Sequence, residues 1–197
     1  MILLPDFYAQ DTTSVARQLL GCYLVHLEGD RTTSGRIVET EAYLTGDPAS
    51  HAFRGKTKRS SVMFGPAGYA YVYLSYGLHV CLNVVTGQVG QGEAVLLRAL
   101  EPLEGLATMQ ERRRTTRESL LCNGPARLTE ALGVPLTLNG YPLFEGPFQI
   151  WSADSFPLLP PTETADIIQT TRIGLSKAAD LPLRFYLRNN PHVSRRG

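Results

Sequence analysis

The stretch YAYVYLSYGLHVCLNV, residues 69–84, is the most regularly patterned part of the chain and holds four of its nine tyrosines. Tyr69, Tyr71 and Tyr73 alternate with Ala70, Val72 and Leu74. Because successive side chains of a strand point to opposite faces, the three phenols are expected to share one face. Gly77 then separates this strand from a second one. The stretch predicts two strands with an aromatic face suited to a flat ligand, and a fourth tyrosine, Tyr76, just past the alternation.

Outward from these two strands, the sequence contains more strands and a few short helices. Apolar and β-branched runs predict strands at residues 22–28, 31–44, 93–102, 148–153 and 183–188. A turn followed by an amphipathic helix is expected over residues 6–20, and further helices are expected at residues 104–114 and 123–134. Thr12, Thr13 or Ser14 is expected to cap the first helix, and Pro125 lies near the start of the last. The elements indicate an α+β protein, one mixed domain over residues 1–197 with a mainly antiparallel sheet.

Composition is that of an ordinary globular protein, with 43% hydrophobic and 19% charged residues in 197. The N-terminus lacks the basic start of a signal peptide, and no apolar run is long enough to span a membrane. Cys22, Cys81 and Cys122 are odd in number and far apart, which disfavours disulfides and zinc. We expect a cytoplasmic protein with buried free thiols.

The net charge is only +1, but twelve of the nineteen basic residues fall in three short segments. Their members are Arg54, Lys56, Lys58 and Arg59; Arg112, Arg113, Arg114 and Arg117; and Arg184, Arg188, Arg195 and Arg196. No acidic residue occurs between Asp47 and Glu93, around the first segment. The segments either form one positive face, which would suit nucleic acid, or are ordinary solvated surface.

Several polar residues lie within apolar strands. In RIVETEAYL, Glu39, Glu41 and Tyr43 are expected on one face, either as charges on an exposed edge strand or as part of a site. Arg98 lies among leucines in VLLRAL and requires a partner, for which Glu39 and Glu41 are candidates. Asn83 in VCLNVVT is either a structural hydrogen-bonding residue or part of a polar pocket.

Residues 45–68 are polar and rich in Gly, Ser and Pro, and so predict a long loop. His51 lies in this loop, where it is either solvated or placed over a pocket. The four histidines make no metal-binding spacing, and neither a serine nucleophile elbow nor a phosphate-binding loop is present. We therefore expect no metal and no cofactor, and chemistry based on a carboxylate and water.

These motifs closely resemble the alkyladenine DNA glycosylases, also called methylpurine or 3-methyladenine DNA glycosylases, of the mammalian type. The resemblance covers nearly the whole chain in order: VETEAYL, the histidine loop, MFGPAGYAYVYLSYG, CLNVVT, GEAVLLRALEPLEG, CNGPARLTEALG and LPLRFYLR. It implies a curved antiparallel sheet surrounded by helices, and a monomer that acts on duplex DNA containing damaged purines. The implied reaction flips an alkylated or deaminated purine out of the duplex and hydrolyses its N-glycosidic bond, initiating base excision repair.

The resemblance also implies roles for individual residues. Glu41 would activate the attacking water, with Arg98 helping to hold it. The flipped base would lie in a pocket made by Tyr43, His51, Tyr73 and Asn83. Asn83 would discriminate against normal guanine, and Tyr76 would enter the duplex in place of the flipped base.

Other basic residues would contact the DNA backbone, namely Arg54, Lys56, Lys58, Arg59 and Arg127. Two departures from the mammalian pattern occur. The segment between Tyr43 and His51 is one residue shorter, and Leu78 and His79 replace Met and Tyr after Tyr76.

Three other interpretations differ in what they require. A binding module for single-stranded nucleic acid would use the aromatic face and basic loops but no general base, so Glu41→Gln would change nothing. A glycosidase acting on free nucleosides or small sugars would need neither Tyr76 nor the basic segments. A purely structural role is disfavoured by the number of polar groups on apolar strands.

Overall fold

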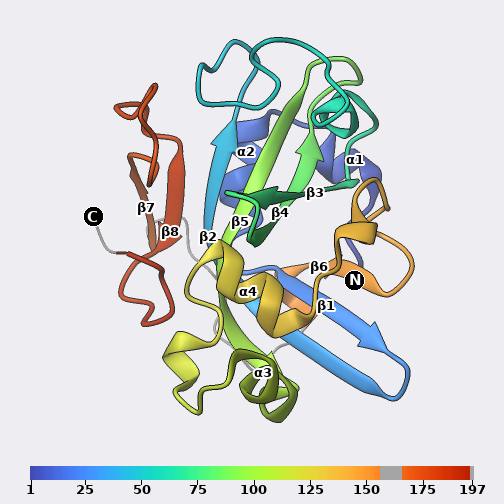
Figure 1. Cartoon of the computed structure of the whole chain (residues 1–197), viewed down its shortest axis with the longest axis vertical. Helices are drawn as coiled ribbons and strands as arrows, with labels where there is room; N and C mark the ends of the chain where they lie inside the picture. Colours follow the sequence, from blue (N-terminus) through green and yellow to red (C-terminus); the bar gives the residue numbers. More distant parts are fainter. Residues whose placement is uncertain (156–165, 196–197) are drawn as a thin grey trace.

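The computed structural model describes residues 1–155 and 166–195. Its centre is an eight-stranded sheet in which every pair of neighbouring strands is antiparallel (Figure 1). The main path runs β3-β4-β5-β2-β1-β6, and β8 joins β2 to β7. The strands are β1 (Tyr23–Glu28), β2 (Arg31–Tyr43), β3 (Ala70–Ser75), β4 (His79–Thr86), β5 (Glu93–Glu104), β6 (Phe148–Trp151), β7 (Ile167–Thr170) and β8 (Arg184–Leu187).

Strand β2 is the longest strand and changes partners along its length. Its first half pairs with β1 and its second half with β8, while β5 follows it from Ser34 to Tyr43. Register shifts interrupt the β2–β5 ladder on both sides of Glu39. Because bulges increase twist and bend a strand, they account for the curl of the sheet at this point. The expected α+β fold with a curved antiparallel sheet is confirmed.

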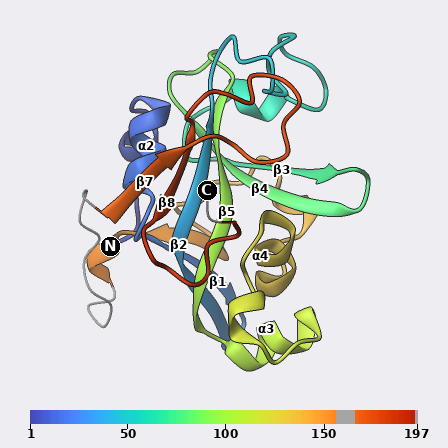
Figure 2. The same cartoon turned by 90° about the vertical axis from the view of Figure 1, so that its left-hand side faces the viewer.

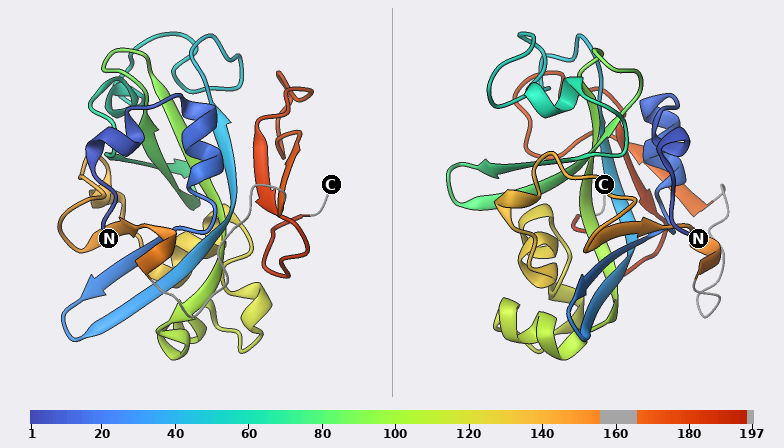
Figure 3. Two further views of the ribbon diagram at one scale, coloured as in Figure 1. Left: turned by 180° about the vertical axis from the view of Figure 1, so that it is seen from behind. Right: turned by 90° about the vertical axis from the view of Figure 1, so that its right-hand side faces the viewer.

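Helices lie on both sides of the β2–β5 layer (Figures 2 and 3). The α-helices are α1 (Pro5–Tyr8), α2 (Thr12–Gln18), α3 (Leu106–Arg113) and α4 (Pro125–Leu132). The short 3-10 helices are η1 (Ser61–Phe64), η2 (Glu118–Leu120), η3 (Leu136–Leu138) and η4 (Ala153–Ser155). The α1–α2 pair covers one side, and α3 and α4 lie on the other together with the β3–β4 hairpin. Within the described residues, no helix is long and apolar enough to cross a membrane.

The helix nearest the N-terminus differs from its prediction in how it begins. The segment forms two short helices, and the side chain of Asp11, not Thr12, Thr13 or Ser14, caps the second by accepting a hydrogen bond from the Ser14 amide at 2.8 Å. An aspartate carboxylate is as good a cap as a hydroxyl, so composition alone does not distinguish the four positions. The predicted Pro125 start of α4 is confirmed.

The β3–β4 hairpin confirms the predicted alternation. Ala70 and Val72 pack into the main core, whereas Tyr71 belongs to a second apolar cluster in which Tyr73 also packs. At the tip, Tyr76 and Gly77 both have positive φ, 50° and 71°, and the Leu78 amide donates to the Ser75 carbonyl. Two positive φ values in succession are typical of a tight hairpin turn. The turn leaves Tyr76 91% exposed.

The three cysteines are buried and unpaired, as predicted. The basic segments do not form one positive face. Arg184 is buried and bonded to Glu39, while Arg112 and Arg113 pair with Glu28 and Glu130. Arg196, in the third segment, lies outside the described residues.

Candidate active site

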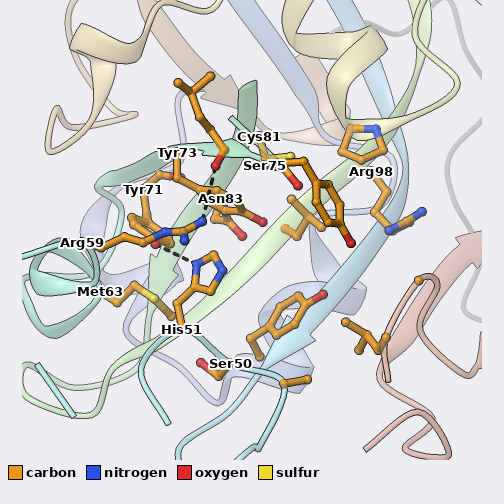
Figure 4. A pocket seen from close by; sticks show the side chains of 18 of the residues that line it. Ser50, His51, Arg59, Met63, Tyr71, Tyr73, Ser75, Cys81, Asn83 and Arg98 are labelled. Carbon is orange, nitrogen blue, oxygen red and sulfur yellow. Dashed lines mark hydrogen bonds between the residues drawn. The ribbon is translucent and has the colours of Figure 1, made fainter. Parts of the chain in front are cut away.

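A cavity of about 680 Å³ opens where the β3–β4 hairpin, the loop after β2 and the segment after β7 meet (Figure 4). Its lining includes the side chains predicted for the base pocket: Tyr43, His51, Tyr73 and Asn83. Arg59, Tyr76 and Arg98 also line it. These residues come from positions 43–98, and antiparallel pairing of β2, β5, β4 and β3 brings them together.

Glu41 lies directly behind two of these lining residues. Its side chain is fully buried, and its Oε2 accepts a hydrogen bond from the Tyr43 hydroxyl at 2.9 Å. Its Oε1 accepts from the backbone amide of Ile173 at 2.8 Å and pairs with Arg98 Nη1 at 3.1 Å. The two side chains that donate to Glu41, those of Tyr43 and Arg98, both line the cavity. A carboxylate offers about four acceptor positions, and these contacts use three of them.

Glu39 holds Arg98 from the other side and is equally buried. Its Oε1 accepts from Arg98 Nε at 3.0 Å, from Arg184 Nη1 at 3.1 Å and from the Ser194 hydroxyl at 2.9 Å. Its Oε2 accepts from the Ser194 amide at 2.7 Å. The alternative of an exposed edge strand is therefore wrong, and both candidate partners of Arg98 are confirmed.

The two carboxylates and two guanidinium groups balance in charge inside the protein. Burial alone would lower the pKa of Arg98, but Glu41 and Glu39 together raise it. The same surroundings hold Tyr43 as a neutral donor, because burial and the adjacent Glu41 charge raise the pKa of its phenol. Arg98 is consequently a fixed cation at the cavity wall, and Tyr43 a fixed hydroxyl donor to Glu41.

Arg172 is a part of the site that sequence reasoning missed. Arg172 is buried and donates to the Ala42 carbonyl at 3.1 Å. It also forms a bidentate ion pair with Asp47, in which Nη1 donates to Oδ2 and Nη2 lies 3.0 Å from Oδ1. Its guanidinium lies over the Tyr43 ring, 4.7 Å from the centroid. The pairing joins the start of the long loop to residues 173–175, which line the cavity. An arginine in TTRIGL carries no local signal for such a role.

His51 lies against the two tyrosines of β3. Its Nδ1 is 2.8 Å from the Tyr71 hydroxyl, and its ring meets that of Tyr73 edge-on at 4.5 Å. Partial desolvation in the cavity, aided by the nearby charge of Arg59, lowers the pKa of His51 to about 4. Burial raises the pKa of both phenols. The cluster is therefore uncharged near neutral pH, apart from Arg59.

Asn83 is buried at the inner end of the cavity, on β4. Its Nδ2 donates to the Tyr71 carbonyl at 3.1 Å, which fixes the orientation of the amide. Cys81, two residues before it, also lines the cavity, as do Ser50 and Met63 from the long loop. None of these three was singled out from the sequence as a pocket residue.

The residues predicted to contact the DNA backbone separate into two groups. Arg54, Lys56 and Lys58 are exposed on the long loop and do not line the cavity. Arg127 is exposed on α4 and donates to Asn123 at 2.7 Å. Arg59, by contrast, lies over the Tyr73 ring at 5.1 Å and donates to the Leu74 carbonyl at 3.4 Å. Within the described parts of the chain, no group of three or more His, Cys, Asp or Glu side chains is placed to hold a metal ion.

Comparison with known proteins agrees with this geometry. Residues 6–191 match the family model described as methylpurine-DNA glycosylase. Proteins named as 3-methyladenine DNA glycosylases are 59% identical in Methanoculleus marisnigri and 50% in Carboxydothermus hydrogenoformans, over the full length of both chains in each case. One in Francisella tularensis subsp. tularensis is 47% identical over 94% of both chains. The chain belongs to the methylpurine-DNA glycosylase family and is a hydrolytic DNA N-glycosylase.

Proposed function

We propose that this glycosylase flips an alkylated or deaminated purine out of duplex DNA and cleaves its N-glycosidic bond with a water activated by Glu41. The observation that carries the proposal is the position of Glu41 behind the cavity wall, bonded to Tyr43 and Arg98. A carboxylate is one of the side chains that can take a proton from an attacking water as a general base. The attacking water would bond to the fourth acceptor position of this carboxylate.

The cavity then holds the flipped base. Tyr43 and Tyr73 supply aromatic faces, and stacking on such faces contributes about 1–3 kcal/mol per base. That energy offsets the few kcal/mol spent on unstacking the base from the duplex. His51 bounds the cavity beside Tyr73. Asn83 presents its amide at the inner end, where it would crowd the exocyclic amine of normal guanine.

Tyr76 has the role of a wedge that replaces the flipped base in the stack. Tyr76 is 91% exposed at the tip of a tight hairpin, and Leu78 beside it is 79% exposed. Exposed apolar side chains on a tight turn have no role in the core, but side chains of this kind insert between base steps in other proteins. Arg54, Lys56, Lys58 and Arg127 would neutralise phosphates on either side. We further propose that the enzyme acts as a monomer and that the abasic product enters base excision repair.

The test is single-turnover cleavage of labelled duplex oligonucleotides carrying hypoxanthine or 7-methylguanine, with abasic sites revealed by alkali. Glu41→Gln is the informative variant, because the Tyr43 hydroxyl can rotate to accept from the new amide and the site stays packed. We expect wild type to cleave, and the variant to bind the same duplex but cleave about 10²–10⁴-fold more slowly. Electrophoretic binding on the same samples and a thermal unfolding curve serve as controls. Cleavage by Glu41→Gln at the wild-type rate would exclude Glu41 as the base.

A further inference from the structure

The two tyrosines of the proposed base pocket each have an arginine over their ring. Arg172 lies 4.7 Å from the Tyr43 centroid and Arg59 lies 5.1 Å from the Tyr73 centroid. A positive charge over one face of a ring weakens the electrostatic attraction of the opposite face for a cationic base. Cation–π attraction between a positively charged alkylpurine and these rings is therefore reduced before the base arrives.

The two arginines differ in how their charge is balanced. Arg172 is buried and paired with both oxygens of Asp47, and Arg98 is paired with Glu39 and Glu41. Arg59 has no ion pair within the described residues, and its hydrogen bond goes to the neutral Leu74 carbonyl. The described residues that line the cavity include no Asp or Glu. Arg59 is thus the uncompensated charge of the cavity.

We propose that Arg59 is a specificity-determining residue, which disfavours positively charged alkylpurines in the pocket and favours neutral purines that carry hydrogen-bond acceptors. The inference rests on the proposed function, because it requires a flipped base in this cavity. Figure 4 shows the Arg59 side chain extending alongside Tyr71 and Tyr73 into the cavity. A guanidinium there donates to acceptors such as the exocyclic oxygen of hypoxanthine. The same group repels a base that carries a positive charge, such as 7-methylguanine in DNA.

The repulsion acts over a short distance. A base stacked on Tyr73 lies well within the screening length of about 8 Å at physiological salt, so salt does not cancel it. Water at the cavity mouth weakens the interaction below that of a buried pair. We therefore expect Arg59 to change the selectivity between the two lesions by about tenfold, equivalent to about 1.4 kcal/mol.

The experiment compares single-turnover rates on duplexes identical except for hypoxanthine or 7-methylguanine, for wild type, Arg59→Gln, Arg59→Lys and Arg54→Gln. Arg54 is the matched control, because it is exposed on the same loop and carries the same charge but does not line the cavity. For Arg59→Gln we expect the ratio of the 7-methylguanine rate to the hypoxanthine rate to rise about tenfold relative to wild type. Arg59→Lys keeps the charge and should stay near the wild-type ratio. Arg54→Gln should slow both substrates by the same factor.

If Arg59→Gln changed the cleavage rates of both lesions by the same factor, the proposal would be overturned and Arg59 would be a phosphate contact. A fall in the ratio would also overturn the proposal, and would mean that Arg59 favours the cationic base. Either result would leave the proposed function intact, because that depends on cleavage by wild type and its loss in Glu41→Gln. If wild type cleaves neither duplex, both proposals fail.

Discussion

Replacing Glu39 by glutamine tests how the buried ion network supports the site. The amide is nearly the same size as the carboxylate, so the change removes a charge without opening a cavity. In the wild-type protein Glu39 accepts from Arg98, Arg184 and Ser194. After the change, the network keeps two buried guanidinium groups but one carboxylate, Glu41, which pairs with Arg98.

The structure sets the size of the effect. Removing one partner from a buried ion pair costs about 3–5 kcal/mol, because the remaining charge is left uncompensated. The glutamine can keep its oxygen toward Arg98 and Arg184, but its NH₂ group then faces the Ser194 amide, and two donors cannot bond each other. We therefore expect Glu39→Gln to lower the free energy of unfolding by about 3–5 kcal/mol, a fifth or more of that of a typical domain.

Urea unfolding followed by circular dichroism measures this directly. Glu28→Gln is the control, because Glu28 also pairs with an arginine, at 2.7 Å, but its side chain is 51% exposed. Exposed pairs contribute about 0–1 kcal/mol, so the control should be close to wild type. The double variant with Arg184→Met should cost less than the sum of the single changes, because it removes a charge of each sign. A loss below about 1 kcal/mol in Glu39→Gln, or strict additivity in the double variant, would refute the charge-balance argument.

Two further predictions concern the cavity and the hairpin tip. Because the pKa of His51 falls from 6.5 in the unfolded chain to about 4 in the folded protein, the unfolded chain binds more protons between these values. The contribution of His51 to stability is therefore complete above about pH 6.5 and is lost as the pH falls toward 4. Unfolding curves at several pH values should show a shallower acid loss in His51→Gln, and identical slopes would contradict the prediction. Tyr76→Asn should leave the free energy of unfolding within about 0.5 kcal/mol of wild type, since the ring is 91% exposed and asparagine tolerates the φ of 50°. The same variant should cleave lesion duplexes about tenfold more slowly, because it no longer replaces the base in the stack; unchanged cleavage would argue against the wedge.

Local patterns were enough to predict most of the sheet. The alternating tyrosines and the apolar runs at residues 22–28, 93–102 and 183–188 each depend on near neighbours, and each corresponds to an observed strand. Strand β7 was not predicted, because it is only four residues long, three of them partly buried and one exposed, and it pairs with β8 alone. Polar residues within apolar strands were equally informative. A buried charge requires a partner, and this requirement alone predicts that Arg98 pairs with Glu39 or Glu41.

The parts of the site that were missed depend on contacts between distant segments. Arg172 and Asp47 are 125 positions apart, and the Ile173 amide reaches Glu41 across 132. No spacing rule connects such positions in one sequence. The possibility that the basic segments form one positive face fails for the opposite reason. Residues of these segments lie close together in the chain but have different environments in the fold. Arg184 is buried, Arg188 is exposed, and Arg112 is held by Glu28.

The charge balance around Glu41 also resolves a conflict within the proposed mechanism. A general base must be negative, yet it must act beneath a strand of phosphates, and an unpaired carboxylate there would repel the substrate. Here the negative charges of Glu39 and Glu41 are matched by Arg98 and Arg184 within about 3 Å, so the network presents little net charge to the DNA. Proton transfer from water to Glu41 would remove one negative charge and leave the network positive. In the proposed mechanism that positive charge would lie near the leaving purine, where it would favour departure of a neutral base that carries the bonding electrons away from the sugar. Glu39 and Arg184 would then affect the cleavage rate without contacting the substrate. Their effect would come from the net positive charge that the ion network carries once Glu41 has accepted the proton from water.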